Sequence, residues 1–235
     1  MPDKGRVSEI FSSLQGEGIY WGKKQIFVRF FGCNMKCVYC DEEEKTFFGP
    51  YEEMDAQTLR QKVGALEESE GPHHSISLTG GEPLLYVDFL KHLAPLLKRD
   101  GFLLYLETNG TYPGRLKEIL DWIDIIAMDI KPPSSTRDRA FWPEHREFLE
   151  IGRRKGIFVK IVVTPETSSE EVERAASEVA RVDQKIPFIL QPVTPHGLLG
   201  ETIAKVSLFQ FEERAKRVLD DVRVIPQLHK FAGVP

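Results

Sequence analysis

The chain has 235 residues, of which 41% are hydrophobic and 29% charged, a balance typical of a soluble globular domain. Its net charge of −5 argues against a general nucleic-acid or membrane-surface binder, because those proteins need a basic face. No apolar run approaches the roughly 20 residues that span a bilayer, and residues 1–10 lack the apolar core of a signal peptide. We therefore expect one cytoplasmic domain over residues 1–235, with neither nucleic acid nor membrane as a partner.

Runs rich in branched and aromatic residues alternate with segments of helical periodicity. The expected strands are 26–31, 75–79, 102–107, 123–129, 157–163, 188–191 and 222–225. Apolar stripes predict helices near 89–97, 172–179 and 208–218, and Ser168 or Ser169 would cap the second of these. Strands that alternate with helices predict parallel βαβ units. About six units are too few for a full eight-fold barrel, so we expect an α/β fold, a partial (β/α)6-type barrel with mostly parallel strands.

Polar residues, glycines and prolines gather just after several of the expected strands. These segments are 33–40, 79–83, 107–110, 129–132 and 191–194. In a sheet or barrel of this kind, the loops at the carboxyl ends of the strands carry the chemistry. The sequence therefore predicts one functional site built from these loops.

Cys33, Cys37 and Cys40, the three cysteines of the chain, lie within eight residues at CxxxCxxC spacing. An odd number of cysteines without a secretion signal does not fit a disulfide framework. Three such thiolates can hold three corners of an iron–sulfur cube and leave the fourth iron open to a chelating cofactor. A structural zinc site completed by a distant histidine is the alternative. The candidate histidines are His73, His74 and His229.

The cysteine motif, with Tyr39 before its third cysteine, resembles that of the radical S-adenosylmethionine (SAM) superfamily. The turn Gly80-Gly81-Glu82-Pro83 matches a second hallmark of that superfamily, and its two glycines would let the backbone approach a ligand. The resemblance implies a radical SAM core with a [4Fe–4S] cluster on the three cysteines. SAM would chelate the open iron and be cleaved reductively to a 5′-deoxyadenosyl radical.

Both ends of the chain are similar to 7-carboxy-7-deazaguanine synthases. The matching segments are EIFSSLQGEG at 9–18, FVRFFGC at 27–33 and PQLHKFAGVP at 226–235, and the resemblance spans essentially the whole chain. It implies conversion of 6-carboxy-5,6,7,8-tetrahydropterin to 7-carboxy-7-deazaguanine with loss of ammonia, on the way to queuosine and related deazapurines. Hydrogen abstraction from C6 of the pterin, ring contraction and return of the hydrogen to SAM are implied as well.

The same resemblance implies roles for individual residues. Arg29 would pair with the substrate carboxylate, for which a fork-shaped guanidinium is a natural partner, although a structural ion pair is the alternative. Pro235 would reach the substrate from a closing tail at about 226–235, and an N-terminal substrate loop is expected at about 9–25. The other expected substrate contacts are Leu14, Gln15, Gly16 and Thr79. The expected SAM contacts are Gly81, Asp129, Ile130, Lys131, Gln191, Pro192, Val193 and Thr194.

The sequence departs from the family pattern at two places. Family members often carry Thr two residues beyond the third cysteine, where its hydroxyl ligates Mg²⁺. Here the position is Glu42, whose carboxylate is also a hard oxygen ligand for Mg²⁺. Its negative charge beside an anionic substrate could change the metal preference or make the metal dispensable, and Thr46 is the alternative ligand. The second departure is the segment 129–131, Asp-Ile-Lys where many members have Ser-Pro-Lys.

The remaining expectations concern partners and competing functions. Relatives suggest a homodimer, and a one-electron reductant such as flavodoxin or ferredoxin would supply the electron. His229 and Lys230 could close the open side of the barrel or act in catalysis. A radical SAM activase that makes a glycyl radical on a partner protein would share the cysteine loop but would not require the Gln-Gly-Glu-Gly segment or Pro235. A non-catalytic zinc-binding interaction protein is the other alternative.

Overall fold

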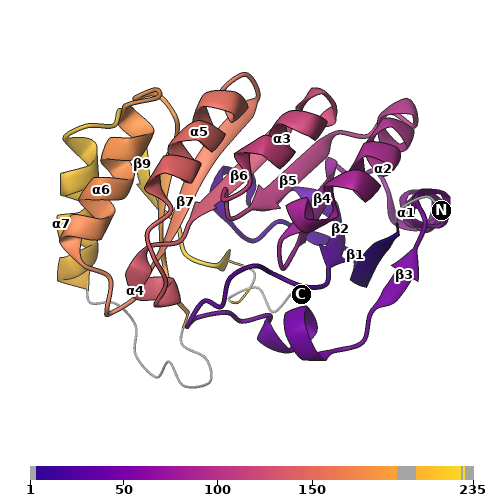
Figure 1. The fold of residues 1–235 in the computed structure, drawn as a ribbon, viewed down its shortest axis with the longest axis horizontal. Helices are drawn as coiled ribbons and strands as arrows, with labels where there is room; N and C mark the ends of the chain where they lie inside the picture. The colour runs from indigo at the N-terminus through magenta and orange to yellow at the C-terminus, as the bar shows by residue number, and fades with distance from the viewer. Residues whose placement is uncertain (1–3, 195–204, 229, 231–235) are drawn as a thin grey trace.

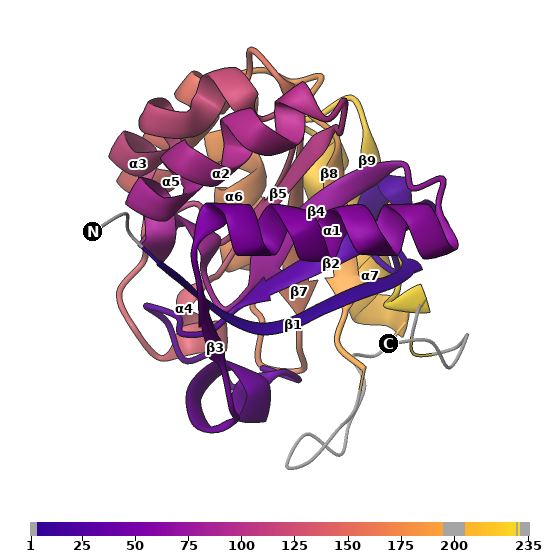
Figure 2. The ribbon, with the colours of Figure 1, turned by 90° about the vertical axis from the view of Figure 1, so that its right-hand side faces the viewer.

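A single mixed sheet organises the fold (Figures 1 and 2). Within residues 4–194, 205–228 and 230, which the computed structural model describes, nine strands pair in the order β3-β1-β2-β4-β5-β6-β7-β8-β9. The strands are β1 (Gly5–Leu14), β2 (Lys24–Phe30), β3 (Glu52–Met54), β4 (Ser75–Gly80), β5 (Leu104–Thr108), β6 (Ile125–Ile130), β7 (Gly156–Val163), β8 (Phe188–Pro192) and β9 (Val222–Val224). From β2 to β9 all neighbouring strands are parallel, whereas β1 is antiparallel to both β2 and β3.

The seven expected strands are confirmed, each with both ends within two residues of the observed bounds. Because β3 and β9 lie at opposite ends of the strand order and do not pair in the described part of the chain, the structure is the expected partial barrel. The carboxyl ends of its parallel strands all point to the same edge. Loops from distant parts of the sequence can therefore meet there.

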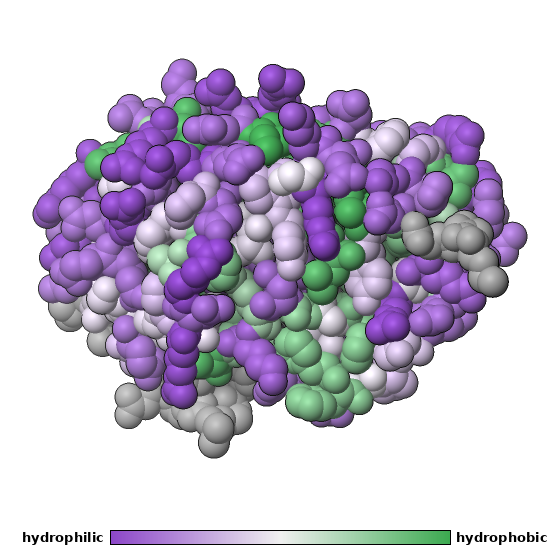
Figure 3. Space-filling view, viewed as in Figure 1, coloured by the Kyte–Doolittle hydropathy of each residue, from purple (hydrophilic) through white to green (hydrophobic). Residues whose placement is uncertain are grey.

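Helices connect the parallel strands and cover the outer face of the sheet (Figures 1 and 2). The helices are α1 (Ala56–Glu70), α2 (Val87–Arg99), α3 (Pro113–Ile119), α4 (Pro133–Thr136), α5 (Trp142–Gly152), α6 (Ser169–Ala180) and α7 (Lys205–Lys216). Their outward surface is mainly hydrophilic, as the space-filling view shows (Figure 3). None of the described helices is long and apolar enough to cross a membrane.

Side-chain capping explains where two of these helices begin. Ser168 accepts a hydrogen bond from the backbone N–H of Glu171 (3.2 Å), and the Glu171 carboxylate accepts one from the N–H of Ser168 (3.0 Å). This reciprocal pair is a capping box and confirms Ser168 as the cap of α6. Asp55 caps α1 by accepting a hydrogen bond from the N–H of Thr58 (2.8 Å).

Alternation along the strands separates two apolar layers. Leu104 and Leu106 belong to the large core between sheet and helices, whereas Tyr105 faces the inside of the curved sheet. Tyr105 packs there against Phe158 and Tyr20, with ring centroids 5.7–6.4 Å apart. Tyr105 and Phe158 lie near the amino ends of their strands, so the carboxyl-terminal half of the inner face remains for the site.

The N-terminal strand β1 differs from the sequence prediction. Residues 9–14, expected in a substrate loop at about 9–25, form the end of β1, and 24–25 begin β2. Phe11 stacks on its cross-strand partner Phe27 with ring centroids 5.2 Å apart, which fixes the register of this hairpin. The loop that remains, residues 15–23, is short and is held at its base by the strand pair.

Candidate functional site

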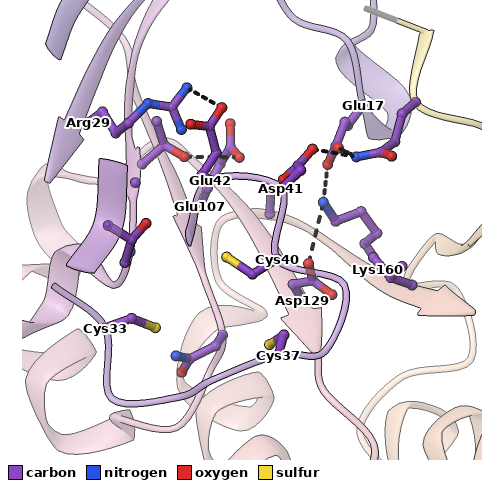
Figure 4. Close-up of a pocket in the computed structure, with 18 of the residues that line it drawn as sticks. Glu17, Arg29, Cys33, Cys37, Cys40, Asp41, Glu42, Glu107, Asp129 and Lys160 are labelled. Atoms are coloured by element: carbon purple, nitrogen blue, oxygen red, sulfur yellow. Dashed lines mark hydrogen bonds and ion pairs between the residues drawn. The ribbon is translucent and has the colours of Figure 1, made fainter. Parts of the chain in front are cut away.

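A cavity of about 440 Å³ opens at the carboxyl ends of the parallel strands (Figure 4). Its volume lies within the range of small-molecule sites. Most of the residues that the sequence singled out line it: Leu14, Gln15, Gly16, Arg29, Cys33, Cys37, Cys40, Glu42, Thr79, Gly81, Asp129, Lys131, Gln191 and Val193. The structure therefore gathers segments that are up to about 180 residues apart in the sequence around one space.

Three of the expected contacts are not among the residues that line this cavity. Ile130 is fully buried in the core between sheet and helices, because alternation along β6 turns its side chain away from the side that Asp129 faces. Pro192 and Thr194 are not among the lining residues. Pro235 lies outside the described residues, as does His229.

The cysteine loop is fastened to neighbouring loops at two points. The Asn34 side chain donates to Thr111 Oγ1 (3.0 Å) and accepts from Asn109 Nδ2 (2.8 Å), which ties the loop to the segment after β5. The backbone N–H of Val38 donates to the carbonyl of Ser135 in α4 (2.8 Å). Held in this way, the three thiols face a common space in Figure 4.

The surroundings of the cysteines fit a cluster better than a single metal ion. Among the described residues, no three His, Cys, Asp or Glu side chains are grouped closely enough to hold one ion. Thiols at three corners of a cubane stand further apart than thiols that share one zinc. Burial raises the pKa of Cys33 to about 12, and binding of a metal by the thiolate would release this proton.

Two of the three histidines considered for a zinc site lie far from the cysteines. His73 and His74 precede β4, at the amino end of a strand parallel to β2, whereas the cysteines follow the carboxyl end of β2. His73 is hydrogen-bonded instead to Ser12 (2.8 Å) and Glu67 (2.6 Å). The expectation that either histidine completes a zinc site with the cysteines is therefore wrong.

The glycine turn after β4 packs against the start of the cysteine loop. Gly80 has φ +114°, and a Cβ on it would lie 2.4 Å from the backbone N and O of Phe30. A Cβ on Gly81 would lie 1.9 Å from the carbonyl oxygen of Gly32. Gly81 N–H donates to Phe30 O (3.0 Å), and Glu82 N–H donates to Gly32 O (2.9 Å). The sequence predicted that these glycines let the backbone approach a ligand. In the structure, they let it approach another part of the protein's own backbone, at Phe30 and Gly32.

Glu82 of the same turn joins two loops, a role that the sequence analysis did not identify. Its carboxylate is fully buried and accepts hydrogen bonds from the backbone N–H of Leu84 (2.9 Å) and Asn109 (2.8 Å) and from Thr108 Oγ1 (2.9 Å). Burial raises the pKa of Glu82 to about 7 in spite of these donors. The turn, the cysteine loop and the segment after β5 form one hydrogen-bonded unit.

His145 supports this unit from α5 and gives a pH-dependent prediction. Its Nε2–H donates to the carbonyl of Asn109 (3.0 Å), and burial lowers its pKa from the ordinary 6.5 to about 4. Between these values the unfolded chain binds more protons, so stability falls as the pH falls. Between pH 7 and pH 5, the free energy of unfolding should fall by about 2 kcal/mol less in the neutral variant His145→Gln than in the wild type.

The measurement is urea unfolding at both pH values, with His92→Gln, at an exposed position on α2, as the control for replacing a histidine by glutamine. Parallel pH dependences for His145→Gln and the wild type would show that His145 does not contribute.

Arg29 belongs to a closed ring of four charges at one side of the cavity. Its Nε lies 3.1 Å from Glu9 Oε2, and its Nη2 lies 3.3 Å from Glu42 Oε1. Lys45 Nζ lies 3.1 Å from Glu9 Oε2 and 3.5 Å from Glu42 Oε2. The structural ion pairs considered for Arg29 are therefore present. Arg29 also lines the cavity, so the pairs do not remove it from the site.

A second ionic group lies across the cavity and was not predicted. Lys160, in β7, is ion-paired with Glu17 and lies 3.4 Å from Asp129 Oδ2 (Figure 4). Lys131 Nζ lies 2.7 Å from the same Asp129 oxygen. Burial lowers the pKa of each lysine, but the neighbouring carboxylates outweigh it, and the net pKa is raised. The signal that could have revealed this group is a lysine inside the apolar run 157–163.

The described part of the C-terminal tail reaches both the loop of residues 15–23 and the cysteine loop. Leu228 N–H donates to Gly16 O (2.8 Å), and Gln227 Nε2 donates to Glu17 Oε1 (2.9 Å). Lys230 Nζ lies 3.0 Å from Asp41 Oδ2, directly after the third cysteine. Gln227 and Lys230 also line the cavity, so this part of the tail lies beside the same space as the cysteines.

Some buried polar atoms at the cavity have no hydrogen-bond partner within the described residues. They include Asp129 Oδ1 and both amide atoms of Gln191. Buried polar atoms are normally paired, so these groups are suited to a polar ligand in the cavity. Both residues belong to the segments where SAM contacts are expected.

Comparisons with known proteins agree with this geometry. Residues 27–179 match the model of the radical SAM superfamily. The fold is similar to QueE from Escherichia coli (TM-score 0.65, 20% identity, 96% of this chain and 95% of that chain). It is also similar to Streptococcus suis SuiB bound to S-adenosylmethionine (TM-score 0.60, 16% identity, 83% and 48%). The chain is a member of the radical SAM superfamily, which implies a [4Fe–4S] cluster and SAM.

Curated relatives narrow the family further. The chain is 43% identical to the 7-carboxy-7-deazaguanine synthase of Geobacter sulfurreducens, over 97% of this chain and 96% of the relative. It is 33% identical to the enzyme of that name from Methanocaldococcus jannaschii, over 97% and 99%. The chain belongs to the 7-carboxy-7-deazaguanine synthase family.

Proposed function

We propose that this enzyme converts 6-carboxy-5,6,7,8-tetrahydropterin to 7-carboxy-7-deazaguanine with release of ammonia. The observation that carries the proposal is the shared cavity: Gln15 and Gly16 near the N-terminus, Arg29 and the three cysteines all line it. The full-length similarity to relatives of that name supports the same conclusion. An activase would need no such substrate loop beside its cysteines.

The cofactor side of the cavity is assigned to the cysteines and to the segments after β6 and β8. Cys33, Cys37 and Cys40 would hold the cluster, and when bound, cluster and SAM supply the radical that abstracts the C6 hydrogen. Asp129 and Gln191, with their unpartnered buried atoms, would bind polar groups of SAM. Gly81, Lys131 and Val193 line the same cavity, whereas Ile130 could contribute only through its backbone.

The substrate side is assigned to residues 14–16, Arg29 and Thr79. Gln15 is almost fully buried, and its Nε2 donates to Gln25 Oε1 (3.0 Å) and Glu107 Oε1 (2.9 Å). Thr79 Oγ1 donates to the other Glu107 oxygen (3.2 Å). These contacts fix the polar edge of the cavity before a ligand arrives, which favours binding of a flat heterocycle rich in donors and acceptors.

The geometry does not support the expectation that Glu42 binds Mg²⁺. Both Glu42 oxygens face cationic side chains, Arg29 and Lys45. Thr46, the alternative ligand, is buried at the cavity and its N–H donates to Glu42 O (2.8 Å). A homodimer and a flavodoxin- or ferredoxin-type reductant complete the proposal, on the strength of the resemblance.

The decisive experiment uses anaerobically reconstituted protein whose iron and sulfide content has been measured. Incubation with a reductant, SAM and 6-carboxytetrahydropterin should give 7-carboxy-7-deazaguanine, identified by mass spectrometry. Zinc in place of iron would overturn the enzyme assignment. Reductive SAM cleavage without the product would leave the superfamily membership intact and overturn the substrate.

Arg29→Ala tests the substrate carboxylate assignment. Loss of a charge-assisted hydrogen bond should weaken pterin binding by about ten- to hundred-fold, while reductive SAM cleavage without pterin stays near the wild-type rate. Arg6→Ala is the matched control, because Arg6 forms an exposed pair with Glu53 on β3, outside the cavity. Equal pterin affinity in the two variants would contradict the assignment.

A further inference from the structure

We infer that Lys45 takes the place of the divalent cation expected at Glu42, so that this enzyme binds the carboxylate of its substrate between Arg29 and Lys45 and needs no Mg²⁺. The inference rests on the proposed function. It is carried by the ring of four charges, Glu9–Arg29–Glu42–Lys45, and by the position of that ring at the cavity.

The local fold brings Glu42 and Lys45 to the same place. A short helical turn, Glu44–Phe48, follows the cysteine loop, and Thr46 N–H donates to Glu42 O (2.8 Å). Side chains three residues apart lie on the same side of such a turn. Ser8 Oγ donates to the carbonyl of Lys45 (3.0 Å), which fastens the turn to β1. Lys45 is thus positioned by backbone contacts on both sides.

The ring leaves binding capacity on both cations. Lys45 carries three N–H donors, and two carboxylates, Glu9 and Glu42, lie beside it at 3.1 and 3.5 Å. Arg29 reaches Glu9 through Nε and Glu42 through Nη2, and its guanidinium carries five N–H donors in all. Both cations line the cavity. A substrate carboxylate can therefore bind to further N–H donors of Arg29 and Lys45 while the ring of charges stays in place.

A magnesium ion does not fit the same place. Mg²⁺ requires close, near-octahedral oxygen ligands and gives up its water reluctantly. At Glu42 it would have to displace Arg29 and Lys45 and would then lie beside two positive charges. A neutral hydroxyl at this position would leave room for the charge of a metal. Glu42 leaves no such room, because Lys45, three residues later, already neutralises its charge.

The first test measures the metal requirement of the reconstituted holoenzyme. After treatment with EDTA, the rate of 7-carboxy-7-deazaguanine formation should equal the untreated rate and should not rise when Mg²⁺ is added. A rate that is lost on chelation and restored by Mg²⁺ would overturn the inference while leaving the proposed function standing. Absence of product under every condition would instead overturn the proposed function.

The second test measures pterin binding to the unreduced holoenzyme with SAM, by fluorescence, so it does not depend on turnover. Lys45→Met should weaken binding about ten-fold, the effect of one charge-assisted hydrogen bond, and Lys45→Arg should restore most of it. Lys62→Met is the control, since Lys62 pairs with Glu52 outside the cavity. The inference would be overturned if Lys45→Met bound pterin with wild-type affinity. It would also be overturned if Mg²⁺ raised the pterin affinity of Lys45→Met to that of Lys45→Arg.

Discussion

Replacement of Lys160 by methionine should lower the free energy of unfolding by about 3–5 kcal/mol, because it leaves the Glu17 carboxylate without its cation and removes one of the two cations beside Asp129. The Lys160, Glu17 and Asp129 side chains are only 12%, 19% and 15% exposed. Methionine keeps most of the length and apolar volume of lysine, so the lost charge dominates the effect. Urea unfolding of the cluster-free protein measures the difference.

A matched surface lysine separates burial from simple loss of charge. Lys91 also bridges two carboxylates, Asp88 (2.6 Å) and Glu118 (2.8 Å), but on the exposed face of α2. Exposed pairs contribute little, so Lys91→Met should change the unfolding curve only slightly. In addition, Glu17→Gln should recover part of the stability lost in Lys160→Met. Similar curves for the two lysine variants would mean that water reaches the Lys160 site and screens it.

The regular part of the fold was predictable because burial leaves a periodic pattern in the sequence. Apart from Lys160, the run 157–163 is apolar on both sides of the strand, which is typical of a parallel strand covered on both faces, and it forms nearly all of β7. Strand β1 was missed because its segment 9–14 was assigned by the Gln-Gly-Glu-Gly resemblance to a loop. The stack of Phe11 on Phe27 that fixes it depends on a partner in another strand.

The site was predictable where parallel strands end in unusual residues, and not where side chains meet across loops. The cysteines and the glycine turn could be placed at one edge from topology alone. The contacts of Glu82 with Thr108 and Asn109, and of Lys45 with Glu9, join residues 26–36 positions apart. Their spacing carries no periodic signal, so only the folded chain reveals them. The glycines of the turn show the same limit. The sequence predicted that they allow a close backbone approach, but not that the backbone packed against them is that of Phe30 and Gly32.

Gly81→Ala should prevent the cysteine loop from reaching its observed position. The added Cβ would lie 1.9 Å from Gly32 O, a backbone atom next to Cys33, and also 2.9 Å from Thr46 Cγ2. Neither a rotamer change nor a small shift relieves an overlap with backbone. We expect a loss of about 3 kcal/mol or more in unfolding free energy. Iron bound after reconstitution should fall steeply as well, because Cys33 would be displaced from the other two thiols.

Gly114→Ala is the control that makes this result specific. Gly114 lies in the first turn of α3, where a Cβ would meet nothing within 4 Å, and alanine there should leave stability unchanged or slightly raised. Both variants add one methyl group to one glycine, so only the steric surroundings differ. If Gly81→Ala bound as much iron as Gly114→Ala, the turn would serve the cofactor directly rather than by packing against the loop. Because Gly81 N–H already donates to Phe30 O, we expect the packing role to dominate.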